Sequence, residues 1–201
     1  LLILEYQQTT KKPNMNLPKL NIDKTWTLFL DRDGVINKKI ENNYVRKWDE
    51  FEFLPGVLEA IKIFSNTFGR IIVVTNQQGI AKERMTEDEL TQIHEQMVKE
   101  IEKNGGRIDA IFYAPYLKEI NHIDRKPNVG MALKAKKKFP EINFKKAIIA
   151  GDSQSDMEMG ARMNMIKILI NNDISIAQKQ PKLVNFTYKS LYDFSFVLNK
   201  L

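Results

Sequence analysis

Five short apolar runs, each rich in β-branched residues, recur along the chain. Each run is nearly continuous in its hydrophobicity, which is typical of parallel strands that are buried on both faces of a sheet. We predict strands at Thr27–Leu30, Ile71–Val74, Ile108–Ala114, Ala147–Ala150 and Ile166–Ile170. A further short run near the end of the chain, Asn185–Tyr188, predicts a strand at the edge of the same sheet.

Apolar residues at helical spacing separate most of these strands. Thr86 followed by Glu89 has the pattern of a capping box, in which each side chain binds the backbone N–H of the other residue, so a helix is predicted to begin there. The first predicted helix follows Pro55-Gly56 and carries an apolar stripe of Val57, Leu58, Ile61 and Phe64. The next three run from Thr86 to Gly105-Gly106, over Val129–Phe139 and over Ser155–Met163. Ser190 is predicted to cap a last helix, which carries Leu191, Phe194 and Leu198.

The alternation of strands and helices predicts an α/β fold, a doubly wound parallel sheet with right-handed crossovers. The predicted elements fill the intervals from Asp31 to Thr75 and from Thr75 to Lys126, so neither interval has room for a separate cap domain. We therefore expect one capless domain over residues 15–201, with an open site shielded by loops alone. Residues 1–14 are expected to be an extension that carries no information on function.

Composition does not alter the predicted fold, but it excludes some classes of function. The chain has 43% apolar and 28% charged residues, as globular proteins do, and the absence of Cys excludes a thiol nucleophile, a disulfide scaffold and an iron–sulfur cluster. Apolar runs reach only about five residues where roughly 20 span a bilayer, so we expect a cytoplasmic protein with no membrane partner. The net charge of +6 suits an enzyme that collects phosphorylated metabolites, and the Lys-rich stretch 134–146 is best explained as a solvated helix face.

Polar residues follow three of the predicted strands. In a doubly wound sheet, ligands bind outside the carboxyl ends of the strands, so these residues are expected to lie together. Each segment alone is common in turns and helix caps, but their joint occurrence at strand ends predicts a functional site. The segments are Asp31-Arg32-Asp33-Gly34, Thr75-Asn76-Gln77-Gln78-Gly79 and Gly151-Asp152-Ser153-Gln154-Ser155-Asp156, with Arg125-Lys126-Pro127 before the third predicted helix.

The chemistry that these residues favour is phosphoryl transfer. Asp31 and Asp152 are able to hold Mg²⁺ through oxygen ligands, and a carboxylate is also able to attack phosphorus and form an aspartyl-phosphate. Asp33, two residues after Asp31, is suited to protonate the leaving oxygen and then to activate water.

Neighbouring groups would neutralise the phosphoryl oxygens as charge builds on them. We assign this role to the Thr75 hydroxyl, to the Asn76 amide or backbone N–H groups, and to the Lys126 ammonium. Gly34 gives the chain room for a sharp turn beside the phosphate.

The four segments resemble the four motifs of the haloacid dehalogenase superfamily, and in particular its heptose bisphosphate and histidinol-phosphate phosphatases. The resemblance covers roughly residues 26–170. It is carried by Asp31–Asn37, Thr75–Ile80, Arg125–Pro127 and Gly151-Asp152 with Asp156, and it extends to Asn43-Tyr44-Val45 and Phe51–Val57.

The resemblance implies a role for each matching residue. Asp31 is implied as the nucleophile and Asp33 as the general acid and base, while Thr75 and Lys126 bind the phosphate. The implied Mg²⁺ ligands are Asp31, the Asp33 carbonyl and Asp152, with Asp156 in support. Arg125 is implied to contact the substrate. With no cap domain, specificity is expected to come from residues such as Arg125, Asn37 and the 114–124 loop.

Two departures from the family pattern bear on cofactor and substrate. Many relatives carry a Cys/His zinc loop before the Arg-Lys-Pro motif, and its four ligand positions correspond here to Ala114, Tyr116, His122 and Asp124. Two possible ligands do not close a tetrahedral site, so we predict no zinc and interpret His122 as a surface loop residue. Ser153 stands where heptose bisphosphate phosphatases usually carry Lys.

The resemblance implies a Mg²⁺-dependent phosphomonoester hydrolase that removes one phosphate from a small metabolite, D-glycero-D-manno-heptose 1,7-bisphosphate. Histidinol-phosphate phosphatase is an alternative, as is polynucleotide 3′-phosphatase, although we do not expect a nucleic acid partner. A binding protein on an inactivated hydrolase fold is the alternative outside the enzymes. The intact Asp31, Asp33, Lys126 and Asp152 argue against it, and the oligomeric state stays open.

Overall fold

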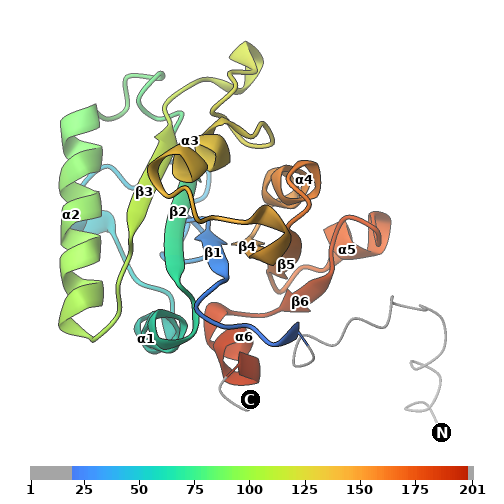
Figure 1. The fold of residues 1–201 in the computed structure, drawn as a ribbon. Coiled ribbons are helices and arrows are strands. Elements are labelled where there is room, and N and C mark those ends of the chain that lie inside the picture. The colour runs from blue at the N-terminus through green and yellow to red at the C-terminus, as the bar shows by residue number, and fades with distance from the viewer. Residues whose placement is uncertain (1–19, 199–201) are drawn as a thin grey trace, which may run out of the picture.

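The sheet of the computed structural model, which describes residues 20–198, is parallel throughout (Figure 1). Within these residues the strand order is β3-β2-β1-β4-β5-β6, so the predicted doubly wound sheet and its edge strand are confirmed. The strands are β1 (Thr27–Leu30), β2 (Arg70–Asn76), β3 (Ala110–Ala114), β4 (Ala147–Gly151), β5 (Ile166–Ile170) and β6 (Phe186–Tyr188).

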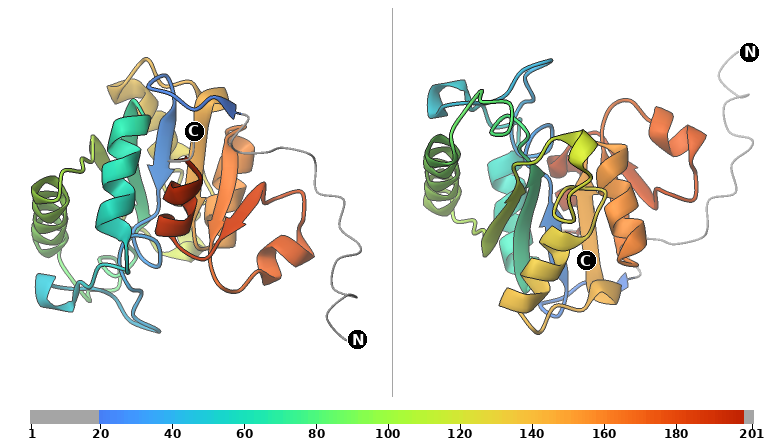
Figure 2. Two further views of the ribbon diagram at one scale, coloured as in Figure 1. Left: turned by 90° about the horizontal axis from the view of Figure 1, so that it is seen from below. Right: turned by 90° about the horizontal axis from the view of Figure 1, so that it is seen from above.

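Helices cover both faces of the sheet. Helices α1 and α6 lie over one face and α3 and α4 over the other, as the two views in Figure 2 show. The helices are α1 (Val57–Thr67), α2 (Glu87–Lys103), α3 (Gly130–Lys138), α4 (Gln154–Arg162), α5 (Ser175–Lys179) and α6 (Leu191–Leu198). Among the α-helices of residues 20–198, α5 alone was not predicted, because its five residues carry no apolar stripe at helical spacing.

Alternate residues of each strand enter opposite layers of the core. Leu28 and Leu30 of β1 pack with α1, α2 and α6, whereas Phe29 packs with α3 and α4. Burial of both faces explains why the strands read as continuous apolar runs rather than alternating ones. The loops after β1 and β4 therefore follow strands whose side chains are buried throughout.

Local sequence signals set the ends of the helices as predicted. The Thr86 hydroxyl accepts a hydrogen bond from the Glu89 N–H at 3.1 Å, and the Glu89 carboxylate accepts one from the Thr86 N–H at 2.7 Å. Ser190 caps α6 in a similar way, by accepting from the N–H of Asp193 at 3.1 Å. These caps satisfy backbone donors that the first turn of a helix leaves without partners.

The described part of the chain forms one domain without a cap insertion. None of the helices within residues 20–198 is long and apolar enough to cross a membrane. The predicted extension, residues 1–14, lies outside the described residues, and the domain start at residue 15 stays a prediction for the same reason.

Candidate functional site

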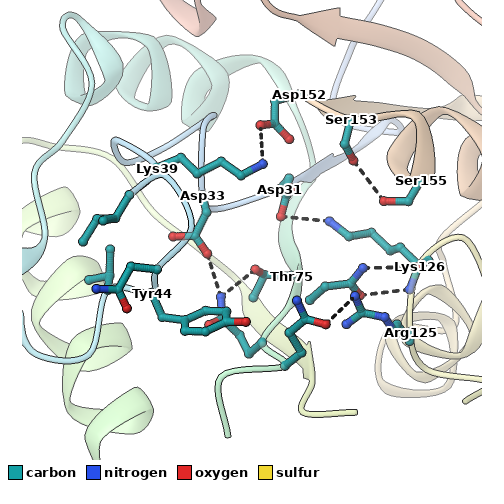
Figure 3. Close-up of a pocket in the computed structure, with 16 residues that line it drawn as sticks. Asp31, Asp33, Lys39, Tyr44, Thr75, Arg125, Lys126, Asp152, Ser153 and Ser155 are labelled. Carbon is teal, nitrogen blue, oxygen red and sulfur yellow. Dashed lines mark hydrogen bonds and ion pairs between the residues drawn. The ribbon is translucent and has the colours of Figure 1, made fainter. Parts of the chain in front are cut away.

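The loops after β1, β2 and β4 and the segment before α3 surround one pocket of about 260 Å³ (Figure 3). It lies where the strand order reverses between β1 and β4, the usual ligand position in such sheets. Seven predicted site residues line it, namely Asp31, Asp33, Thr75, Asn76, Arg125, Lys126 and Asp152. The remaining two, Asn37 and Asp156, are fully buried and lie outside its described lining.

The loop after β1 turns at a glycine. Gly34 has a φ of +87°, in the left-handed region, and a Cβ at this position would overlap the carboxylate of Asp152. Any other residue would therefore be strained and would displace a site carboxylate. The Gly34 N–H donates to the Asn37 carbonyl at 2.7 Å, which closes the turn.

A buried lysine lies between two buried carboxylates. Lys126 Nζ is 2.8 Å from Asp31 Oδ1 and 2.6 Å from Asp156 Oδ1, and it donates to the Val74 carbonyl at 2.7 Å. Burial opposes the charge of Lys126, but Asp156 and Asp31 outweigh burial and hold its pKa above its ordinary value. The ammonium is thus fixed beside the Asp31 oxygen.

Three carboxylates crowd together at this point. Burial, with Asp156 and Asp152 nearby, raises the pKa of Asp31 to about 7 despite the opposing charge of Lys126. Burial and Asp156 also raise the pKa of Asp152, while Lys39 opposes the shift. Such crowding of negative charge is stabilised by a bound cation.

The carboxylates offer ligands that Mg²⁺ prefers. One oxygen each from Asp31, Asp152 and Asp156 lie within 4.8 Å of one another. Asp156 Oδ2 already accepts from the Ser153 N–H at 3.1 Å and from its hydroxyl at 2.5 Å, so its position suits a supporting role. Binding of the cation by Asp31 and Asp152 stays a prediction. This donor set fits a cation that takes one or two carboxylates and keeps water and phosphate ligands. The role of the Asp33 carbonyl stays a prediction.

Asp33 is held by three side chains. Arg32 Nη2 donates to both of its carboxylate oxygens, at 2.8 and 2.9 Å, Asn37 Nδ2 donates to Oδ1 at 3.0 Å, and Gln77 Nε2 donates to Oδ2 at 2.8 Å. Burial acts to raise the pKa of Asp33, but Arg32 above all, with Asn37 and Gln77, lowers it below its ordinary value. The arrangement stabilises the carboxylate, the form that accepts a proton.

Gln77 links the Asp33 carboxylate to the hydroxyl of Thr75, which was predicted to bind phosphate. Its Nε2 donates to Thr75 Oγ1 at 2.9 Å as well as to Asp33, and its side chain is almost fully buried. Because Thr75 accepts this bond, its own hydroxyl proton is left to donate toward the pocket. The sequence placed Gln77 at the strand end, but nothing in the pattern indicated this bridge.

The Asn76 side chain holds the lysine segment. Its Nδ2 donates to the Lys126 carbonyl at 3.1 Å, and its Oδ1 accepts from the Lys126 N–H at 3.0 Å. Asn76 lines the pocket, and its side-chain amide ties β2 to the segment before α3. Any contact with phosphate, as predicted from the sequence, would be additional to this role.

Arg125 and Asn37 were both predicted to contact substrate, and they occupy different places. Arg125 lines the pocket and donates to the Tyr116 carbonyl at 2.9 Å and to Gln78 Oε1 at 3.3 Å. Asn37 lies beneath Asp33 and donates to the Lys38 carbonyl at 2.9 Å, so the structure places it in support of the acid.

The structure adds a cation that the sequence did not indicate. Lys39 lines the pocket, and its Nζ lies 3.2 Å from Asp152 Oδ2, on the side of Asp31 away from Arg125 (Figure 3). Its carbon chain reaches across from a loop far from Asp152 in sequence, so no spacing rule could have identified the pair. The ammonium occupies a place beside a predicted metal ligand.

Lys39→Met is expected to tighten Mg²⁺ binding about fivefold. An ammonium beside Asp152 competes with the cation for the same carboxylate, and a partly exposed pair of this kind is worth roughly 1 kcal/mol. Isothermal titration of the metal-free protein measures the change. Lys38→Met is the matched control, because Lys38 pairs with the exposed Glu52. Equal or weaker Mg²⁺ binding in Lys39→Met would show that Lys39 does not compete.

Comparison with known proteins shows the family to which the chain is related. Residues 27–190 match a family model described as polynucleotide kinase 3 phosphatase. The D-glycero-alpha-D-manno-heptose-1,7-bisphosphate 7-phosphatase of Campylobacter jejuni is 38% identical over 150 residues, 75% of this chain and 84% of the relative. The D-glycero-beta-D-manno-heptose-1,7-bisphosphate 7-phosphatase of Escherichia coli is 30% identical over 181 residues, 86% of this chain and 93% of the relative.

Solved structures give the same fold. The D,D-heptose 1,7-bisphosphate phosphatase of B. bronchiseptica, complexed with magnesium and phosphate, has a TM-score of 0.79 at 27% identity and covers 87% of this chain and 98% of its own. The L-2-haloacid dehalogenase of Xanthobacter autotrophicus has a TM-score of 0.57 at 7% identity, covers 89% of this chain and 99% of its own, and shares the fold alone. The predicted haloacid dehalogenase fold is confirmed.

Proposed function

Because the chain belongs to the polynucleotide kinase 3 phosphatase family, we propose that it is a Mg²⁺-dependent phosphatase that removes the 7-phosphate from D-glycero-D-manno-heptose 1,7-bisphosphate. The observation that carries the substrate class is Arg125, a cation on the wall of the pocket that holds Asp31. A second cationic site beyond the reacting phosphate suits a substrate with two phosphates. The names of the relatives support a heptose bisphosphate.

The first chemical step uses both aspartates of the loop after β1. An Asp31 oxygen attacks phosphorus, the bond from phosphorus to the sugar oxygen breaks, and an aspartyl-phosphate forms. Asp33 gives its proton to the leaving oxygen. The approach of a phosphate dianion favours protonated Asp33 at this stage, because nearby negative charge raises the pKa of a carboxyl group.

The second step returns the protein to its starting state. Asp33, now a carboxylate, takes a proton from a water that attacks phosphorus, and the bond to Asp31 breaks with release of inorganic phosphate. The three donors on Asp33, from Arg32, Asn37 and Gln77, stabilise the carboxylate that this step requires. The same residue thus serves as acid and then as base.

Thr75 and Lys126 are placed to neutralise the phosphoryl oxygens. The Lys126 ammonium lies 2.8 Å from Asp31 Oδ1, so it is adjacent to any phosphorus that this oxygen binds. The Thr75 hydroxyl faces the same space from β2. Bound Mg²⁺ supplies a further hard positive charge beside Asp31 and Asp152. Fixed charges of this kind act most strongly where water is excluded.

A polynucleotide substrate is less well supported by the basic residues of this chain. Lys134 pairs with Asp124 at 2.6 Å, and Lys136 donates to the carbonyls of Pro140 and Ile142, at 2.6 Å each. These lysines hold loops in place, so they contribute less to a backbone-binding face than their number in the sequence suggests. The absence of a nucleic acid partner and a cytoplasmic location stay predictions.

Phosphate release tests the proposal on several substrates in parallel. With Mg²⁺ we expect one equivalent of phosphate, lost from carbon 7, from the α or β heptose 1,7-bisphosphate, with no turnover after EDTA and recovery on Mg²⁺ addition. Histidinol phosphate and a 3′-phosphorylated oligonucleotide are the comparison substrates. A higher kcat/KM on either would replace the proposed substrate, and no release from any ester would contradict the enzyme class.

A further inference from the structure

Arg125 is held by the loop in which it lies. We define the Arg125 loop as residues 116–128, between β3 and α3. Arg125 Nη1 donates to the Tyr116 carbonyl at 2.9 Å, and the Arg125 backbone N–H donates to the His122 carbonyl at 3.0 Å. The guanidinium end and the backbone of Arg125 are therefore fixed by two different residues of the same loop.

Tyr116 and His122, the residues that fix Arg125, are stacked on each other. Their ring centroids are 3.5 Å apart and the ring planes differ by 23°. His122 Nδ1 also accepts the backbone N–H of Asp124 at 3.1 Å, so its ring is held in orientation. The stack joins Tyr116, at the beginning of the loop, to His122, three residues before Arg125.

An ion pair between an exposed lysine and a buried carboxylate anchors the other side of the loop. Asp124 is only 4% exposed, and Lys134 of α3 lies 2.6 Å from its Oδ2. Asn128 Nδ2 donates to the carbonyls of Asn121 and His122, at 3.1 and 3.0 Å. With the base of the loop fixed, the Tyr116–His122 stack holds the Tyr116 carbonyl that accepts from Nη1 of the guanidinium, and Gln78 Oε1, outside the loop, accepts from Nη2 at 3.3 Å.

We propose that the Tyr116–His122 stack is a positioning device that preorganises Arg125 for the phosphate of the substrate that is not transferred. The inference rests on the proposed function, in which Arg125 binds that phosphate. An arginine that is already held in one rotamer loses less conformational entropy on binding, so the stack contributes to affinity without touching substrate. Removing the stack loosens the Tyr116 carbonyl that holds the guanidinium and weakens binding of the second phosphate alone.

His122→Ala tests the proposal through the split between KM and kcat. We expect KM for the heptose bisphosphate to rise about three- to tenfold, the cost of ordering one long side chain, while kcat stays within about twofold. Turnover of p-nitrophenyl phosphate, which has no second phosphate, stays unchanged and shows that the variant is folded. His122→Phe retains an aromatic ring and is expected to restore a low KM.

Two further variants separate the possible failures. Leu133→Ala, on the adjoining helix α3 and outside the 114–124 loop, is the control, because this side chain is 48% exposed and its loss is expected to leave KM unchanged. Arg125→Ala is expected to raise KM for the bisphosphate, and adding His122→Ala to it is expected to have no further effect.

Each contrary result has one meaning. If Arg125→Ala raises KM and His122→Ala does not, the positioning role is wrong and the proposed function stands. The same holds if His122→Phe is as impaired as His122→Ala, because the ring stack is then not what places Arg125. If Arg125→Ala leaves KM unchanged, the assignment of Arg125 fails, and the role of the stack fails with it.

Discussion

Asp31→Asn is expected to abolish phosphate release, with kcat reduced by more than about 10⁴-fold, the scale on which loss of a nucleophile acts. An amide is too weak a nucleophile to form the acyl-phosphate, although it fills the same space. The Asn oxygen is still able to accept the Arg32 N–H, a bond that Asp31 Oδ1 makes at 2.7 Å, so the loop is expected to keep its shape. Steady-state kinetics with Mg²⁺ measure the loss.

The stability of Asp31→Asn distinguishes lost chemistry from lost structure. Burial and the neighbouring Asp156 and Asp152 raise the pKa of Asp31 to about 7, so the ionised carboxylate destabilises the metal-free fold. Replacement by a neutral amide removes this cost, and we expect the melting temperature in EDTA at pH 7 to be no lower than that of the parent protein. Asp49→Asn, at an exposed position, is the control for both measurements.

Retained turnover in Asp31→Asn would contradict the assignment of Asp31 as the nucleophile, whatever the melting temperature. A loss of turnover together with a much lower melting temperature would instead show that the carboxylate holds the fold, and the kinetic loss would carry no information on mechanism. The expected combination, a stable and inactive protein, is produced only by a group whose charge is unfavourable for folding and necessary for the reaction.

The fold was predictable because its signals are local. Continuous apolar runs identify strands that are buried on both faces, and Thr86 with Glu89 identifies the start of α2. Strand β3 begins at Ala110, two residues later than predicted, because the Arg107 N–H and the Asp109 carboxylate on either side of Ile108 are bound by Ser65 and Arg70. Those partners lie far away in sequence, where no local pattern reports them.

The predicted site residues converge for a topological reason. Parallel strands bring their carboxyl ends to one edge, so Asp31, Thr75 and Asp152 meet whatever the details of their loops. The direction of a side chain within an irregular loop has no such rule. The reach of Lys39 to Asp152 and the stacking of Tyr116 on His122 are set by tertiary packing, which no local sequence pattern encodes.

Of the variants proposed for this protein, Lys126→Met is expected to lower the free energy of unfolding the most. The expected loss is about 3–5 kcal/mol in metal-free buffer, the usual cost of removing one partner from a buried ion pair. Methionine fills the space of the lysine chain but leaves Asp31 and Asp156 buried without the ammonium that lies 2.8 and 2.6 Å from them. Urea unfolding in EDTA measures the change. Lys103→Met, which breaks only the exposed pair with Glu100, is expected to cost less than about 1 kcal/mol.

Added Mg²⁺ is expected to raise the unfolding midpoint of Lys126→Met by more than it raises that of the parent protein. The variant keeps the carboxylates of Asp31, Asp152 and Asp156 but lacks the internal cation, so a divalent ion there offsets more unpaired negative charge. An equal shift in both proteins would mean that Lys126 does not share charge with the metal site. A loss below about 1 kcal/mol in EDTA would contradict the buried ion pairs themselves. With both results as expected, Lys126 stabilises the buried carboxylates of Asp31 and Asp156 in the fold and offsets part of the negative charge that a bound cation would otherwise offset.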